Sequence, residues 1–335
     1  MTITASPTAD SARTRSTPPV SARLTRCLVG VSALAAIVLG LGGCIPLDGK
    51  AERAFAATEA KPMKLVVESR FLDIDLTAAP GEEVAIKATI ELRTSGGNET
   101  AEREIEKCLV HVDREGDTLR VRQGKKGEQI DASSWSGRGT LSLALPPGVT
   151  FAISSASGDV AVQGDFGAVP GSISVASGDI SGTLGVASFT TDAASGDSNL
   201  RFLGPLASLT CEAASGDIRV AAPSIANGSF EAASGNITIT GLAGPTKASV
   251  ASGDIALTFV ELPADAEVTV SAASGDVKVL LPAGVEPGGS VSTASGSIQL
   301  GVPGSKAKRS ASLTGTTGRV KASTASGDVT IQPAK

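Results

Sequence analysis

The stretch "EAASGDIRV" (residues 212–220) contains the motif that decides the fold. Its core, Ala-Ser-Gly followed by Asp, Asn or Ser, occurs nine times after residue 150. Successive copies are 18 to 22 residues apart, except for a last interval of 31. The serines of the nine copies are Ser157, Ser177, Ser195, Ser215, Ser234, Ser252, Ser274, Ser295 and Ser326. A short motif at a nearly constant period predicts a repetitive, stacked architecture.

Apolar residues flank the motif on both sides, but with opposite parity. The fourth residue before the serine is mostly apolar, as in Ile153 and Ile173, and the third residue after it is apolar, as in Val160 and Ile180. Because a continuous strand keeps its parity, the chain must turn or bulge at the motif. Glycine permits the positive φ of such a turn, Asp, Asn and Ser can bond nearby backbone N–H groups, and we expect the alanine to fit a crowded corner.

We therefore predict that the Gly-Asp pairs and their variants are structural turn corners. They are Gly158, Asp159, Gly178, Asp179, Gly196, Asp197, Gly216, Asp217, Gly235, Asn236, Gly253, Asp254, Gly275, Asp276, Gly327 and Asp328. Each unit then consists of a short strand, a corner and a second short strand, which cannot bury a core alone but can do so in a stack.

The predicted fold is all-β. Residues 151–335 are expected to form a parallel β-solenoid (β-helix) of roughly eight to ten coils of about 20 residues, with rungs about 4.8 Å apart. The long last interval is interpreted as a degenerate copy at Thr317-Gly318-Arg319-Val320. Residues 64–150 show period-2 alternation, which predicts an N-terminal β region that acts as a cap or as first coils, with charged or glycine-rich loops at 93–107 and 123–139.

The N-terminal residues carry a targeting pattern. Four arginines precede the apolar run of residues 27–43, and Leu41-Gly42-Gly43-Cys44 resembles the lipobox of bacterial lipoproteins. By that resemblance residues 1–43 are a lipoprotein signal peptide and Cys44 is the lipid attachment site, followed by a flexible tether over residues 44–63. An uncleaved membrane anchor and a cleaved, freely secreted chain remain alternatives. All three place the fold outside the cytoplasm.

The charge balance argues against nucleic acid as a partner. Without residues 1–43, which hold four arginines and Asp10, the chain has 25 basic and 33 acidic residues, a net charge of −8. An acidic surface repels a phosphate backbone.

The two remaining cysteines, Cys108 and Cys211, lie on apolar faces of predicted strands. Small buried hydrophobic residues are the commonest role of such cysteines. A disulfide between them, or metal binding, is the less favoured alternative.

The aspartates of the corners form a predicted column that invites comparison with a Ca²⁺ site. Asn236 and Ser297 replace Asp in two copies, and both keep the ability to cap a turn while losing the charge. Capping is therefore favoured over metal binding. We predict neither a metal nor a cofactor.

Matches to catalytic signatures are isolated. Gly196-Asp197-Ser198-Asn199 resembles a hydrolase motif, but no histidine follows His111, which we interpret as solvated. Ser305-Lys306-Ala307-Lys308 matches Ser-x-x-Lys without the helix that such sites need. Trp135 is alone in a loop and the chain has no tyrosine, which is a poor basis for a sugar-binding enzyme. We predict that the protein is not an enzyme.

Across residues 64–335 the chain resembles the bacterial "putative adhesin" family of extracytoplasmic β-solenoid domains of unknown function. The resemblance rests on the repeated Ser-Gly-Asp-hydrophobic units and on "LPPGVTFAISSASGDVAV" (residues 145–162), where a strand ending in Leu-Pro precedes the first repeat. It implies a solenoid outside the cytoplasm and carries no catalytic residues.

These observations predict a lipid-anchored cell-envelope protein whose rigid solenoid is an adhesin-like or scaffolding module. Its expected partners are the membrane, through the N-terminal lipid, and an envelope protein or a cell-wall or surface glycan. The alternative is an envelope ligand or ion sensor that signals to a membrane partner. A carbohydrate-active enzyme is the least favoured hypothesis.

Overall fold

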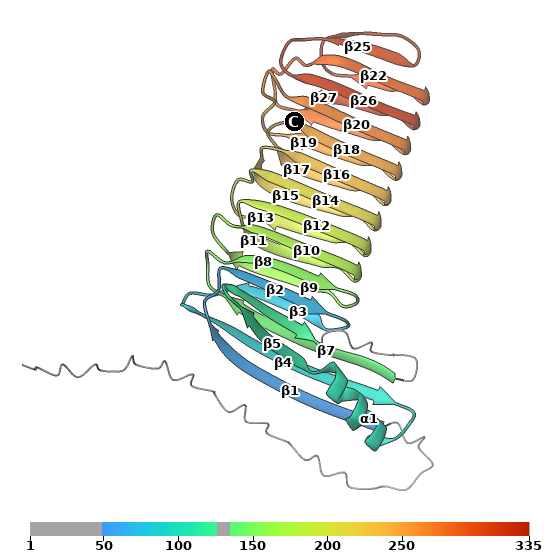
Figure 1. Cartoon of the computed structure of the whole chain (residues 1–335). Helices are drawn as coiled ribbons and strands as arrows, with labels where there is room; N and C mark the ends of the chain where they lie inside the picture. Colours follow the sequence, from blue (N-terminus) through green and yellow to red (C-terminus); the bar gives the residue numbers. More distant parts are fainter. Residues whose placement is uncertain (1–48, 126–134, 335) are drawn as a thin grey trace, which may run out of the picture. The chain divides into compact units, whose positions relative to one another are not determined.

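The computed structural model describes residues 49–125 and 135–334, which all belong to one compact unit. Two long sheets contain nearly all of the described chain (Figure 1). Sheet 1 holds the strand that precedes each corner, and sheet 2 holds the strand that follows it. The prediction of an all-β protein with a parallel β-solenoid is confirmed.

The regular coils lie between residues 150 and 281. In sheet 1 they contribute β8 (Thr150–Ser155), β10 (Pro170–Ser177), β12 (Ser188–Ser195), β14 (Ser208–Ser215), β16 (Gly228–Ser234), β18 (Thr246–Ser252) and β20 (Glu267–Ser274). In sheet 2 they contribute β9 (Val160–Asp165), β11 (Ile180–Gly185), β13 (Ser198–Phe202), β15 (Ile218–Ile225), β17 (Ile237–Leu242), β19 (Ile255–Phe259) and β21 (Val277–Leu281). Neighbouring coils pair in parallel and keep the serines in register, as in Ser177–Ser195 and Ser195–Ser215.

The space between the two sheets is the hydrophobic core. The residues that the parity rule places inward are buried, including Ile153, Ile173 and Ile218. Near the first regular coils, phenylalanines stack along the core: the ring centroids of Phe151 and Phe189 are 6.2 Å apart. Each coil's apolar residues are thus covered by those of its neighbours, as stacking requires.

The C-terminal coils are stacked out of sequence order. They consist of β22 (Gly288–Ser295), β23 (Ile298–Leu300), β24 (Gly304–Lys306), β25 (Ser310–Thr314), β26 (Arg319–Ser326) and β27 (Val329–Pro333). The last coil in sequence, β26 and β27, lies between the coil of β20 and that of β22. The predicted degenerate copy at Thr317–Val320 is wrong, because residues 304–314 pair antiparallel as an end hairpin and residues 315–318 lead back into the stack.

The N-terminal part ends the stack in a similar way. It consists of β1 (Gly49–Ala60), β2 (Lys64–Ser69), β3 (Asp73–Ala78), β4 (Glu83–Thr94), α1 (Asn98–Ile105), η1 (Glu106–Cys108), β5 (Val110–Glu115), β6 (Thr118–Gln123) and β7 (Trp135–Leu145). β2 and β3 form a coil that pairs in parallel with β8 and β9. β6 and β7 pair in parallel with the other side of that coil. Antiparallel β5 extends sheet 1, and antiparallel β4 and β1 extend sheet 2.

Two sequence-based assignments in this part need correction. The predicted tether of residues 44–63 contains β1, which pairs with β4 along its whole length. Phe55 is the one large apolar side chain on its inward face, beside glycine, two alanines, Arg53 and Glu59, so the alternation is too weakly apolar to be seen in the sequence. The predicted loop of residues 93–107 contains α1, whose Ala101 and Ile105 are buried. Residues 44–48 lie outside the described residues.

Candidate functional site

The corners of the coils share one backbone conformation. The motif glycines have φ between 109° at Gly158 and 152° at Gly296, a region that side chains other than glycine avoid. They also stack closely: a Cβ built on Gly216 would lie 2.1 Å from the carbonyl oxygen of Gly196. Both the dihedral angle and the close approach of neighbouring coils therefore require glycine.

The residue after each glycine connects one coil to the next. The side-chain Oδ1 of Asp159 accepts a hydrogen bond from the backbone N–H of Asp179 at 2.8 Å, and the N–H of Asp197 donates to Asp179 in the same way. The whole ladder runs in the order Asp73, Asp159, Asp179, Asp197, Asp217, Asn236, Asp254, Asp276, Asp328 and Ser297. The capping bond thus crosses between coils instead of closing the local turn.

The ladder explains the two departures from aspartate. Asn236 keeps an Oδ1 acceptor and receives the N–H of Asp254 at 2.8 Å. Ser297 lies on the last coil of the ladder, where it donates its own N–H to Asp328 and no further described corner needs an acceptor. A corner that is followed by another coil therefore needs a side-chain acceptor after the glycine, whereas the last corner of the ladder does not.

The aspartate side chains of the ladder are exposed or partly exposed. Arg219 contacts Oδ2 of both Asp217, at 2.5 Å, and Asp197, at 3.6 Å. Within residues 49–125 and 135–334, no group of three or more His, Cys, Asp or Glu side chains could hold a metal ion. The geometry of the ladder is that of amide capping.

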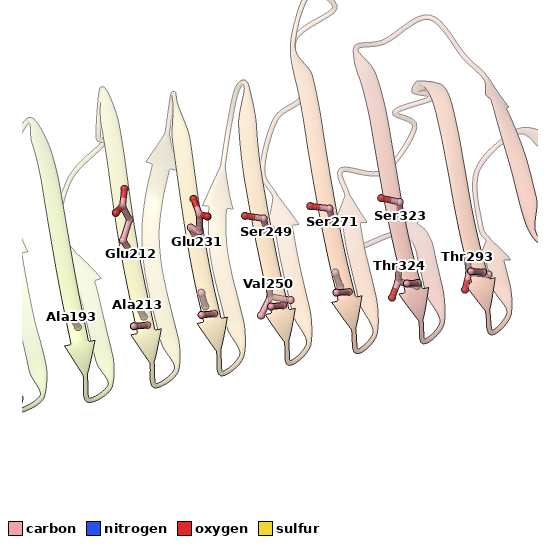
Figure 2. Close-up of a pocket in the computed structure, with 18 of the residues that line it drawn as sticks. Ala193, Glu212, Ala213, Glu231, Ser249, Val250, Ser271, Thr293, Ser323 and Thr324 are labelled. Atoms are coloured by element: carbon pink, nitrogen blue, oxygen red, sulfur yellow. The ribbon is translucent and has the colours of Figure 1, made fainter.

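A shallow groove runs along the corner end of sheet 1 (Figure 2). It consists of two adjoining hollows of about 1080 and 980 Å³ that share Asp192 and Ala194. From β8 to β22 the lining comes from the three positions before the corner serine in successive coils, and residues of β2, β5 and β6 line the remaining end. The same three positions recur in every coil, so the groove is a direct product of the repeat.

The alanine before each corner serine lines this groove. In all nine copies this alanine is exposed, which contradicts the expectation that it fills a crowded corner. The alanines are Ala156, Ala176, Ala194, Ala214, Ala233, Ala251, Ala273, Ala294 and Ala325. Core packing does not explain an exposed residue that is the same in nine copies. The alternation of the strand could have predicted this exposure, because it places the position before the serine on the outer face.

Charge varies along the groove. Asp192, Glu212 and Glu231 are register neighbours on β12, β14 and β16, and serines such as Ser249 and Ser271 follow at the same position (Figure 2). The three carboxylates are exposed. One stretch of the groove is therefore acidic and the next is neutral and hydroxyl-bearing.

The end of the groove near β6 carries charges of both signs. Arg122 donates to Asp113 at 2.5 Å, and Arg120 donates to Glu115 at 3.1 Å and lies 3.7 Å from Glu68. Because these ion pairs are exposed or partly exposed, each contributes little to the free energy of folding.

Buried Gln123 holds the atypical corner between β2 and β3. Its Oε1 accepts from the backbone N–H groups of Arg70 and Phe71, at 2.9 and 3.2 Å. Its Nε2 has no hydrogen-bond partner among the described residues.

The isolated catalytic signatures do not assemble. Ser198 is buried in the core, and Ser305 and Lys306 lie in β24 rather than in a helix. His111 is half-buried on β5 with Nε2 inaccessible, so its interpretation as a solvated residue is wrong in part. Trp135 begins β7 instead of standing in a loop, and its ring packs against Phe71 at 5.5 Å.

Both cysteines of the described chain are fully buried, as predicted, and no disulfide joins them. Burial raises the pKa of the Cys211 thiol to about 12. Cys211 therefore remains an unreactive thiol in the fold. The proposed lipid attachment site, Cys44, lies outside the described residues.

No helix in the described ranges is long and apolar enough to cross a bilayer. The sequence of the chain matches the family model described as Toastrack DUF4097 over residues 64–332. No curated protein matches it.

Solved structures resemble the fold at low identity. A protein named "putative lipid binding protein" from Parabacteroides distasonis is 13% identical with a TM-score of 0.47, covering 86% of this chain and 97% of its own. A "putative adhesin" from the same organism is 14% identical with a TM-score of 0.40, covering 85% and 98%. Another "putative adhesin", from Bacteroides fragilis, is 13% identical with a TM-score of 0.34, covering 85% and 97%. The family match is the stronger finding, because it runs from the start of β2 into β27, and by it the chain belongs to the Toastrack DUF4097 family.

Proposed function

We propose that this chain is a lipid-anchored protein of the cell envelope whose solenoid is an adhesin-like or scaffolding interaction module. Its contact surface is the groove along the corner end of sheet 1. The observation that carries the proposal is the exposed alanine in nine successive copies of the motif. A small side chain at every rung keeps the groove open along the stack, as a surface that receives an extended partner requires.

The lining of the groove supports contact rather than catalysis. Its described side chains are alanines, serines, threonines, carboxylates and a basic group near β6. The carboxylates of Asp192, Glu212 and Glu231 lie side by side on one face, and the described lining of the groove includes neither histidine nor cysteine. An envelope protein or a surface glycan is the class of partner that such a long, shallow surface suits.

The position of β1 supports a short connection to the membrane. Cys44 is only five positions before Gly49, the first residue of β1. Fully extended, this stretch reaches roughly 17 Å. A lipid on Cys44 therefore keeps the N-terminal end of the fold close to the bilayer surface, where a long tether would have let it move freely.

Site-specific photo-crosslinking in cells tests the groove. A photoreactive residue at Ala214 or at Ala251, both exposed in the groove, is compared with one at exposed Thr238 on the outer face of sheet 2. We expect defined crosslinked species from the two groove positions and none from Thr238. The same products from all three positions, or none from the groove, would contradict the proposal.

Lipid labelling tests the anchor separately. Cys44→Ala should abolish incorporation of a labelled fatty acid and shift the protein out of the detergent phase. Unchanged partitioning would mean that residues 27–43 hold the protein in the membrane instead.

A further inference from the structure

The outer edge of β1 differs from the other terminal edges of the two sheets. The other three are short or charged: β23 and β24 have three residues each, and β5 ends in Asp113, Arg114 and Glu115. β1 has 12 residues, and nothing in its centre, Ala54–Thr58, is charged. Proteins normally protect long sheet edges with charges, proline or bulges, because an open edge pairs with another strand.

The hydrogen bonds at both ends show which residues face this edge. Lys61 donates its N–H to the carbonyl of Glu82 at 2.8 Å, which continues the register of β1 with β4. Odd-numbered residues of β1 therefore bond to β4. The N–H of Lys50 instead reaches the side chain of Asn98, at 3.0 Å. Even-numbered residues consequently direct their N–H and C=O groups away from β4.

Side chains cap this edge at its two ends and leave its centre open. Asn98 accepts the N–H of Lys50, and Arg53 donates to the carbonyl of Glu52 at 3.1 Å. At the other end Arg114 donates to the carbonyl of Ala60 at 2.9 Å. Between them Ala54, Ala56 and Thr58 are exposed, and no described strand pairs with β1 on the side away from β4. The open stretch is symmetric about Ala56.

We propose that β1 pairs antiparallel with β1 of a second copy of this chain, about a two-fold axis at Ala56. Ala54 then lies opposite Thr58 of the partner subunit, and Ala56 lies opposite Ala56 of the partner subunit. The three pairs exchange about six backbone hydrogen bonds. Sheet 2 becomes continuous across the two subunits.

The same register is complementary in charge. It places Arg53 opposite Glu59 of the partner subunit, twice by symmetry. Among the described residues Glu59 makes no salt bridge, whereas Arg53 already bonds to Glu102 on α1 and Glu106 on η1. Small side chains on the outer face, Ala54, Ala56 and Thr58, leave room for the partner strand.

Cysteine crosslinking of the full chain in membranes tests this register. Residues that form a hydrogen-bonded pair across the two β1 strands have Cα atoms about 5.5 Å apart, within the range that a disulfide can bridge. Under mild oxidation Ala56→Cys should give a covalent dimer, and the double variant Ala54→Cys with Thr58→Cys should do so too. Ala54→Cys alone, and Thr238→Cys on the same sheet, should stay at the level of the parent chain, which sets the background.

A second variant tests the open edge itself. Ala56→Pro removes an N–H that faces away from β4, a position where an edge strand tolerates proline. We expect this variant to fold with an unchanged midpoint of thermal unfolding and to be monomeric by light scattering in detergent, where the parent chain is dimeric. Ala56→Lys serves the same purpose if proline disturbs β1. A monomeric parent chain, or a dimer that Ala56→Cys does not crosslink, would overturn the proposal, whatever the result for the groove.

Discussion

The regular coils and the N-terminal part of the stack achieve the same end by different means. In the coils, each corner uses one glycine with positive φ and one side-chain acceptor that caps the next coil. In the N-terminal part, β1 and β4 are 12-residue antiparallel strands and α1 covers their inner face. Salt bridges concentrate there: Arg53 bonds to Glu102 and Glu106, and Glu91 to Arg93 and Arg138.

The two parts differ because an internal coil and the end of the stack face different physical requirements. A coil only has to match an identical neighbour, so a short motif repeated without change suffices. The end of a stack has no neighbour, so its core must be covered by other elements and its edges protected. We therefore expect substitutions and acid to affect the stability of the two parts differently.

The largest expected effect is a change at a corner glycine. In Gly216→Ala the new Cβ would meet the carbonyl oxygen of Gly196 at 2.1 Å, at a φ of 134°. We expect the free energy of unfolding to fall by about 3 kcal/mol or more. Gly204→Ala, where a Cβ meets nothing within 4 Å, is the matched control and should be nearly neutral in urea unfolding. Equal effects of the two changes would show that the corner does not constrain the backbone.

A change in the N-terminal part should act locally. Ile105 of α1 is fully buried against the end of the core. Ile105→Ala should therefore destabilise this part by about 2–4 kcal/mol. Hydrogen exchange should increase in β1 and β4 and stay unchanged in β14 to β19.

Exposed Arg103, two residues earlier on α1, is the control for this change, and Arg103→Ala should alter neither region. Faster exchange throughout the coils of the Ile105→Ala variant would mean that the two parts unfold as one unit.

Acid should distinguish the two parts through Glu91. Hydrogen bonds from Arg138 and Arg93 hold the pKa of its carboxyl at about 2. Because this pKa is depressed in the folded state, the stabilisation is present above the ordinary value near 4.5 and is lost as pH falls towards 2. Urea unfolding of Glu91→Gln should therefore depend less on pH between 5 and 2 than that of the parent chain. An identical pH dependence of the two proteins would show that ionised Glu91 does not stabilise the fold.

The sequence predicted the coils well because each corner repeats the same physical constraint. Period, parity and the need for positive φ all follow from residue types at fixed spacing, and the buried Ile153 and Val160 lie where the parity places them. The out-of-order insertion of β26 could not be predicted, because any coil with the same spacing fits any neighbouring pair of coils.

The N-terminal elements and the capping ladder were harder to predict from the sequence, for other reasons. β1 has Phe55 as the one large apolar residue on its inner face, which also carries Arg53 and Glu59, so its alternation gives only a weak apolar signal. α1 has only eight residues and begins without a side-chain cap. The direction of the capping bond, from Asp217 to the next coil rather than to its own turn, depends on stacking geometry that a single repeat does not reveal.

The smallest expected effects concern the corner column, which holds neighbouring coils together by amide capping. Asp254 has no salt bridge in the described structure, and its Oδ1 accepts the N–H of Asp276 at 2.8 Å. Equilibrium unfolding is measured for the parent chain, Asp254→Ala and Asp254→Asn, each with and without added Ca²⁺. We predict a loss of about 1–2 kcal/mol for alanine, less than about 0.5 kcal/mol for asparagine, which keeps the acceptor, and no effect of Ca²⁺. A loss for asparagine as large as that for alanine, together with stabilisation of the parent chain by Ca²⁺, would show that the column binds a cation and would contradict the account.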